Sequence, residues 1–141
     1  MLTSSSSILA LDVGEKRIGI AIANAVARIA HALTTLDHTD DIMQKLIELI
    51  KKEDVAVVVM GLPRSLSGDE TPQTQKVRDF GRALERASGF AIQWQDEALT
   101  SVKAEEELQK RGKPYQKGDI DALAAVYILE DYLNDHLEVR A

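Results

Sequence analysis

Three carboxylates stand at positions that a solvated helix face does not explain. Asp12 interrupts an otherwise apolar segment, ILALDV, where an unpaired carboxylate is costly to bury. Glu97 closes a second strand-like segment, and α/β folds commonly place their sites at the carboxyl ends of strands. Asp121 opens the last helical segment, one turn ahead of small residues that leave space beside it. Three converging carboxylates without histidine or cysteine would form a hard oxygen site suited to Mg²⁺ or Mn²⁺.

Such a site is suited to phosphoryl transfer. Two metal ions roughly 3.5–4 Å apart can activate a water, orient a phosphodiester and stabilise the leaving oxygen. Each acid also has a plainer interpretation: Asp12 as a turn residue before Gly14, Glu97 as a surface charge, and Asp121 as an acid that stabilises the helix dipole. The residues alone leave both interpretations open, because convergence requires the first and last strands to be neighbours.

The elements that must position these acids begin with strands. Apolar or alternating segments at 8–13 and 17–23, joined by turn residues, predict a hairpin, and a weaker segment at 29–36 extends it to three antiparallel strands. The continuous apolar run 55–60 predicts a parallel strand covered on both faces, and 91–95 predicts the last strand.

Helices connect and follow these strands. Periodic apolar residues predict helices at about 42–52, from Pro72 to just before Gly89, from 100 or 101 to about 111, and from Asp119 onward. Thr71 and Asp119 are expected as N-cap residues. The order β-β-β-α-β-α-β-α-α predicts an α/β fold with one mixed sheet whose faces are covered by helices.

Four segments together resemble the motifs of the YqgF/RuvX family, whose members are described as pre-16S rRNA nucleases or Holliday junction resolvases. The segments are DVGEKRIGIA at 12–21, GLP at 61–63 with Gly68, DE at 96–97 followed by LTS at 99–101, and KG at 117–118 with Asp121, Ala124-Ala125 and Ile128-Leu129. The match covers about residues 8–132 in the family's order and spacing. It implies a single ribonuclease H-like domain with a mixed five-stranded sheet flanked by helices, here spanning 7–141. The serine-rich start predicts a disordered tail at 1–6.

The resemblance also implies roles for the acids. Asp12, Glu97 and Asp121 would be the catalytic, metal-binding residues, with Asp12 bridging two Mg²⁺ or Mn²⁺ ions and the other two each holding one. The family commonly has an arginine after the Asp-Glu pair, whereas this chain has Ala98, so a phosphate or carboxylate contact is in question. The implied activity is hydrolysis of phosphodiester bonds in precursor 16S rRNA during ribosome maturation, with the ribosomal small subunit as a further candidate partner.

The charge of the chain constrains how it could hold RNA. The net charge is −6, from 17 Lys+Arg and 23 Asp+Glu, whereas a passive nucleic-acid coat is normally basic. Cations are concentrated instead in the basic segment 110–118, KRGKPYQKG, where Tyr115 could stack on an unpaired base. An ordinary solvated connection is the alternative for this segment. The expected nucleic-acid-binding residues are Lys16, Arg17, Arg64, Lys110, Arg111, Lys113, Tyr115 and Lys117.

Composition adds three expectations about setting. The absence of cysteine excludes disulfides and thiolate metal sites and favours the cytoplasm. The longest apolar run, 122–129, is far shorter than the ~18 residues of a membrane-spanning helix, so no membrane association is expected.

Three alternative functions share the same residues. Branched DNA could replace RNA as the substrate, and resolving a four-way junction would require two symmetric sites and hence a homodimer rather than a monomer. The pattern Asp12-x-Gly14-x-x-x-x-Gly19 also resembles the phosphate loop of actin-like ATPases, which suggests an ATP-binding module. In a non-catalytic adaptor, the acids would merely cap turns and helices.

Overall fold

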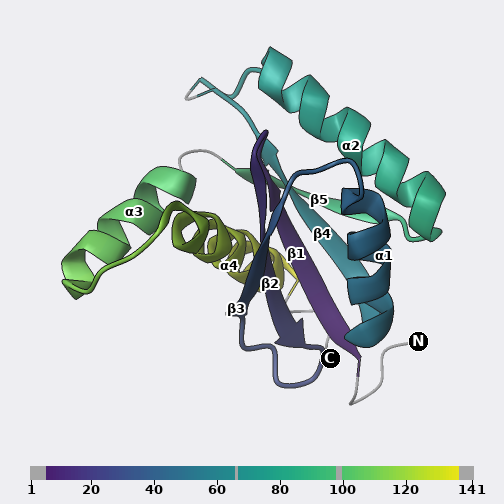
Figure 1. Cartoon of the computed structure of the whole chain (residues 1–141), viewed down its shortest axis with the longest axis horizontal. Helices are drawn as coiled ribbons and strands as arrows, with labels where there is room; N and C mark the ends of the chain where they lie inside the picture. The colour runs from purple at the N-terminus through teal and green to yellow at the C-terminus, as the bar shows by residue number, and fades with distance from the viewer. Residues whose placement is uncertain (1–5, 66, 98–99, 137–141) are drawn as a thin grey trace.

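The structure is a computed structural model that describes residues 6–65, 67–97 and 100–136. Five strands and four helices follow one another in the predicted order (Figure 1). The strands are β1 (Ser7–Val13), β2 (Arg17–Asn24), β3 (His31–Asp37), β4 (Val55–Pro63) and β5 (Ile92–Glu97). The helices are α1 (Ile42–Lys52), α2 (Pro72–Ser88), α3 (Thr100–Arg111) and α4 (Lys117–Asp135).

The strands form one mixed sheet in the order β3-β2-β1-β4-β5. The three N-terminal strands pair antiparallel, whereas β1 with β4 and β4 with β5 pair parallel. Helices α1 and α2 cover one face, and α4 covers the other with α3 packed outside it (Figure 1). The carboxyl ends of β1, β4 and β5 therefore meet at one edge of the sheet, which confirms the predicted mixed five-stranded architecture.

Side chains of β1 alternate between two apolar clusters. Leu9 and Leu11 pack into the cluster under α1 and α2, whereas Ile8 and Ala10 pack into the cluster under α4. Because both faces of the strand are covered, it is apolar from Ile8 to Val13 apart from Asp12, which continues the series that faces α4.

Helix α4 crosses the sheet at close range, and two glycines make room for it. A Cβ atom added to Gly19 on β2 would lie 1.9 Å from the backbone oxygen of Asp121. One added to Gly61 on β4 would lie 2.4 Å from the side chain of Ile128. Near its start the helix is tied to β3, where the Thr35 hydroxyl donates a hydrogen bond of 2.6 Å to the Gly118 carbonyl. The helix thus runs from β3 over β2 toward β4, and it sets Asp121 against β2.

The start of α4 corrects one prediction. Asp119 is the third residue of the helix rather than its N-cap, and Gln116 takes the cap position. The Asp119 carboxylate accepts a hydrogen bond of 2.8 Å from the Gln116 backbone N–H. An acid at this position can reach back to the cap, so the helix begins earlier than the acid itself suggests. The predicted Thr71 cap and the left-handed Gly89 end of α2 are confirmed.

The described residues begin at Ser6, and strands β4 and β5 end side by side. Residues 1–5 of the predicted tail and Ala98 lie outside the described residues. Ser6 is buried, and its carbonyl accepts a hydrogen bond of 2.9 Å from Ala25. Strand β4 continues past the apolar run to Pro63, where it pairs with Glu97 of β5. In the described part of the chain, no helix combines the length and apolar character needed to cross a membrane.

Candidate active site

Asp12 lies near the carboxyl end of β1, opposite Gly19 of β2. Its side chain is half-buried on the face covered by α4. Burial raises the pKa of this carboxyl from 3.8 to about 7, and the negative charge of Asp121 adds to the effect. A carboxyl group placed against another acid in a partly desolvated position binds a cation or a proton more readily than an ordinary surface acid.

Asp121 meets a counter-ion that lies far away in the sequence. The Arg17 Nε atom donates a hydrogen bond of 2.7 Å to Asp121 Oδ2. Their side chains are 31% and 19% exposed, so the pair is only partly screened by water. Arg17, which the sequence predicted as a nucleic-acid contact, thus reaches the centre of the site and offsets the repulsion between the two acids.

Glu97 lies half-buried at the end of β5 and is turned toward another acid of α4. The pKa of Glu97 is raised to about 8, and burial of the carboxyl is the largest cause. A hydrogen bond with the Asp131 side chain and the negative charge of Asp131 raise it further. Lys103 acts in the opposite direction, and Asp12 adds a smaller upward contribution. The Glu97 Oε1 atom is buried and has no hydrogen-bond partner among the described residues.

Asp131 is a site residue that the sequence analysis missed. It lies in α4, where acids were assigned to a solvated helix face, and its position beside Glu97 depends on how that helix crosses the sheet. The sequence contains one indication of this role: Asp131 stands next to Glu130 within YILEDYL, a stretch that is otherwise apolar.

The donor chemistry of these residues fits a divalent cation. All are carboxyl oxygens, and an orphaned buried oxygen at Glu97 has unused capacity to bind one. The acids are nevertheless neighbours rather than an assembled cage: across 6–65, 67–97 and 100–136, no three acidic or histidine side chains are grouped closely enough to hold a metal ion as they stand. Asp12 lies between the other two acids electrostatically: the charge of Asp121 raises the pKa of Asp12, and the charge of Asp12 raises the pKa of Glu97.

The turn between β1 and β2 is braced by a residue to which the sequence analysis gave no role. The His38 backbone N–H donates to the Lys16 carbonyl at 2.8 Å, and the His38 Nδ1 atom bonds the Gly14 carbonyl at 2.7 Å. Inside the turn, the Gly14 N–H donates to the Arg17 carbonyl at 2.9 Å. These bonds hold the segment that follows Asp12 and present Lys16 to solvent.

Arg64 is held by acidic neighbours after β4. Its Nε atom lies 3.1 Å from Asp96 Oδ1, and its Nη1 atom lies 3.8 Å from Glu70 Oε2. A phosphate would have to compete with both carboxylates for this guanidinium.

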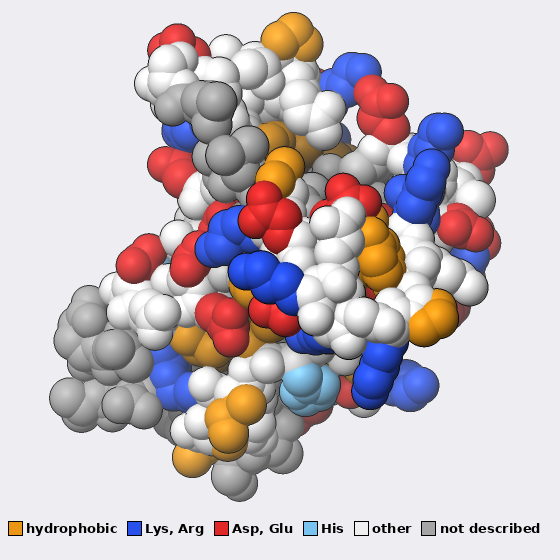
Figure 2. Space-filling model, turned by 90° about the vertical axis from the view of Figure 1, so that its left-hand side faces the viewer, with side chains coloured by type: hydrophobic (Ala, Val, Ile, Leu, Met, Phe, Trp, Pro, Cys, Tyr) orange, Lys and Arg blue, Asp and Glu red, His pale blue; other side chains and the backbone are white. Residues whose placement is uncertain are grey.

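The basic segment 110–118 runs from the last turn of α3 into the first turn of α4. Lys113 and Lys117 are exposed, and Arg111 pairs with Glu107 at 3.4 Å within α3. Tyr115 is half-buried and lines a cavity of about 300 Å³ together with Arg111 and Lys113. Seen from the side where α3 lies, Figure 2 shows basic and acidic side chains next to one another across the middle of this face. The local surface is therefore mixed in charge rather than uniformly negative.

Comparison with known proteins identifies relatives over almost the whole chain. The family model described as RuvX, Holliday junction resolvase, matches residues 6–135. A curated protein of Chloroflexus aurantiacus, named as a pre-16S rRNA nuclease, is 44% identical over 131 residues, which cover 90% of this chain and 86% of that protein. A protein of the same name from Gloeothece citriformis is 38% identical over 136 residues, covering 94% and 90% of the two chains.

Solved structures support the fold. RuvC of T. thermophilus, in complex with Holliday junction substrate, superposes with a TM-score of 0.53 at 15% identity and covers 92% of this chain and 95% of that one. The fowlpox virus Holliday junction resolvase gives a TM-score of 0.53 at 14% identity, covering 92% and 98%. At these identities the likeness concerns the fold, and it confirms the expected ribonuclease H-like architecture.

Proposed function

Because this chain belongs to the RuvX family, we propose that it is a divalent-metal-dependent nuclease that hydrolyses phosphodiester bonds in precursor 16S rRNA. The observation that carries the proposal is Asp12, a half-buried carboxyl placed beside Asp121 at the sheet edge where Glu97 also ends its strand. Relatives named as pre-16S rRNA nucleases, at 38–44% identity over nearly the full chain, supply the substrate class.

Asp12, Glu97 and Asp121 would hold Mg²⁺ or Mn²⁺. When bound, such ions polarise the phosphate and lower the pKa of water. The chain itself supplies acids kept ready for a cation, since the pKa of Asp12 is raised to about 7 and that of Glu97 to about 8. Protons held by these carboxyls near neutral pH must leave before the oxygens can bind a cation, so cation affinity should rise with pH.

Basic side chains near the site would bind the phosphates of the substrate. Arg17 already lies against Asp121, and Lys16 is exposed in the same turn. Lys113 and Lys117 of the basic segment precede Asp121 along the chain and are exposed. Contacts from Lys110, Arg111 and Tyr115 belong to the same proposal, as do a cytoplasmic location and the ribosomal small subunit as a partner.

Branched DNA is the second candidate substrate. The family is described as Holliday junction resolvase, and the two structural neighbours are a Holliday junction resolvase and a protein in complex with Holliday junction substrate. Cleaving a four-way junction symmetrically needs two sites, so this alternative requires a homodimer. Family membership favours either nuclease over the ATP-binding module and the adaptor.

One experiment tests the nuclease and separates its substrates. The purified full chain is incubated with a precursor 16S rRNA fragment and with a four-way DNA junction, each with Mn²⁺ and with EDTA. We expect metal-dependent cleavage of the RNA, loss of that cleavage in Asp12→Asn, and retention in Asp40→Asn, which replaces an exposed acid outside the site. Wild-type cleavage by a folded Asp12→Asn variant would contradict the proposed site, and cleavage of the junction alone would reassign the substrate.

A further inference from the structure

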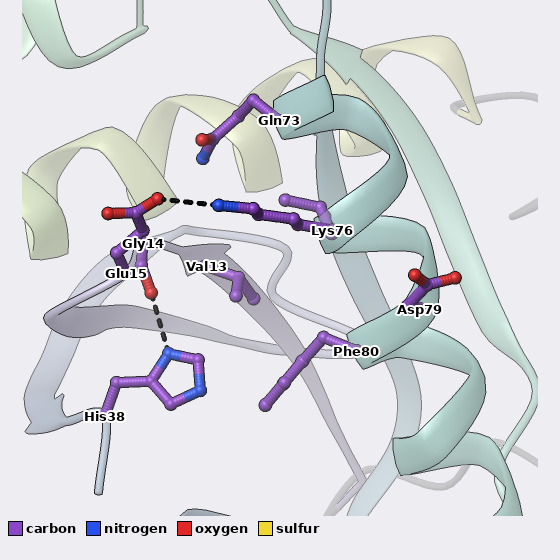
Figure 3. Close-up of a pocket in the computed structure, with 9 residues that line it drawn as sticks. Val13, Gly14, Glu15, His38, Gln73, Lys76, Asp79 and Phe80 are labelled. Carbon is purple, nitrogen blue, oxygen red and sulfur yellow. Dashed lines mark hydrogen bonds and ion pairs between the residues drawn. The ribbon is translucent and has the colours of Figure 1, made fainter. Parts of the chain in front are cut away.

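A pocket of about 350 Å³ lies between the β1–β2 turn and helix α2 (Figure 3). It is on the face of the sheet opposite Asp12, and nothing in the proposed catalytic site uses it. Its lining includes Val13, His38, Lys76 and Phe80, together with the acids Glu15 and Asp79. The volume falls within the roughly 300–1,000 Å³ typical of small-molecule pockets.

The walls of the pocket are apolar and aromatic, with polar groups at the rim. Val13 and Val77 contribute apolar surface. The rings of His38 and Phe80 lie 5.1 Å apart at 71°, so together they form an aromatic corner. Figure 3 shows the Gln73 amide and the Lys76 ammonium on the α2 side of the same space. A flat heteroaromatic group with hydrogen-bonding edges fits this combination better than an aliphatic one does.

The Lys76 cation is available to an anion that accompanies such a group. Its ammonium pairs with Glu15 at 3.1 Å, but the two side chains are 68% and 70% exposed. Exposed pairs of this kind contribute little, about 0–1 kcal/mol, so a phosphate can take the place of the Glu15 carboxylate.

The pocket and the candidate active site lie on opposite faces of the same strand end. Val13 follows Asp12 directly, and successive side chains of a strand point to opposite faces. Gly14, which has no side chain, follows Val13 and also lines the pocket. A nucleic-acid strand passing over this turn could therefore place a phosphate on the Asp12 side and a neighbouring base on the other side.

We propose that this pocket binds one unpaired nucleobase of the substrate strand, next to the phosphodiester held at the Asp12 site. The inference rests on the proposed function and adds a specificity subsite to it. Phe80 and His38 supply the stacking surface, Gln73 hydrogen-bonds the edge of the base, and Lys76 contacts an adjacent phosphate. The site requires a single-stranded or flipped base, because a paired base is not free to enter it.

Binding measurements test the subsite without relying on cleavage. The Asp12→Asn chain, in Mg²⁺, is titrated with a short fluorescein-labelled oligouridine and with an abasic oligomer of the same length. Stacking of one base is expected to make the oligouridine bind roughly tenfold more tightly than the abasic oligomer. Adding Phe80→Leu, which keeps apolar volume but removes the ring, should abolish most of that preference and leave abasic binding unchanged.

The matched control is Phe90→Leu, since the chain has two phenylalanines and Phe90 is half-buried outside the pocket. It should keep the full preference for the oligouridine. No measurable binding, equal binding of the two oligomers, or an unchanged preference in Phe80→Leu would overturn the proposal. Uridine monophosphate that binds as tightly as the oligomer would also overturn it, because the ligand would then be a free nucleotide.

Photo-crosslinking gives an answer even where Phe80→Leu unfolds. An oligomer carrying 5-iodouridine should crosslink to His38 or Phe80, as read by mass spectrometry of the full chain, and crosslinking solely to Tyr115 would refute the assignment. The two proposals can fail separately. Cleavage of precursor RNA without a Phe80-dependent base preference would remove only the subsite, whereas that preference in a chain that does not cleave RNA would remove only the nuclease.

Discussion

The Asp12→Asn substitution should stabilise the metal-free protein at neutral and alkaline pH. In the fold, the pKa of Asp12 is raised from 3.8 to about 7. Between these two values the folded state holds a proton that the unfolded chain has released, so the free energy of unfolding falls as pH rises through this window. Above about pH 7 the carboxylate is charged in both states, and the full cost of burying it has been incurred.

The magnitude follows from the same two values. At about 1.36 kcal/mol per pKa unit, a pKa raised from 3.8 to about 7 corresponds to about 4 kcal/mol. Asparagine has nearly the same shape and no charge, so the variant avoids this cost at every pH. Because the half-buried side chain can relax toward water, we expect the variant's advantage at pH 8 to exceed that at pH 4 by roughly 2–4 kcal/mol.

Urea unfolding in EDTA measures this difference. Trp94, the single tryptophan, is half-buried against the apolar cluster under α1 and α2 and reports the transition by fluorescence. Asp40→Asn serves as the control and should show the same stability relative to wild type at both pH values. If Asp12→Asn gains no more at pH 8 than at pH 4, burial does not raise the pKa of Asp12 in the fold, and the argument for its cation affinity fails.

Three further predictions test the surroundings of the site. Arg17→Gln should lower the free energy of unfolding at pH 7, measured by urea unfolding, by about 1–2 kcal/mol, because the partly buried Asp121 loses its charged partner. An unchanged stability would show that the pair contributes nothing. Gly19→Ala should lower the free energy of unfolding by about 3 kcal/mol or more, measured by thermal or urea unfolding, because its Cβ would overlap the α4 backbone. Gly118→Ala has 3.5 Å of clearance from Thr35 and should be tolerated, so equal effects of the two substitutions would contradict this packing. The double variant Lys113→Gln/Lys117→Gln should reduce the slope of log affinity against log salt for single-stranded RNA by about 1.4 relative to wild type. Lys52→Gln, at an exposed position of α1, should leave the slope unchanged. A wild-type slope in the double variant would exclude the basic segment as a phosphate contact.

Sequence patterns predicted the elements well because their signals are local. The apolar run 55–60 and the periodic residues of α2 carry their own evidence of length and burial, and Thr71 and Gly89 mark the ends of that helix by their chemistry. Ends were less reliable where pairing decides them. Strand β4 extends beyond the apolar run 55–60 to Pro63 because it pairs there with β5, and no apolar pattern marks that end.

The missing parts of the site are tertiary contacts. Arg17 and Asp121 come together only because α4 passes over β2, and Asp131 meets Glu97 only because the same helix continues toward β5. His38 braces the turn after Asp12 from the far end of β3. Such pairs leave no trace in local composition, so three acids could be proposed from the sequence but not their partners.

The close passage of α4 over Gly19 has a consequence for how this protein can be altered. The separation between β2 and the helix is fixed by main-chain atoms in contact, with no side chain as a spacer. Exchanging neighbouring core residues can therefore change stability while leaving Asp12 and Asp121 in register. A single methyl group at position 19 would instead act as a wedge that moves the whole helix, and with it one half of the site.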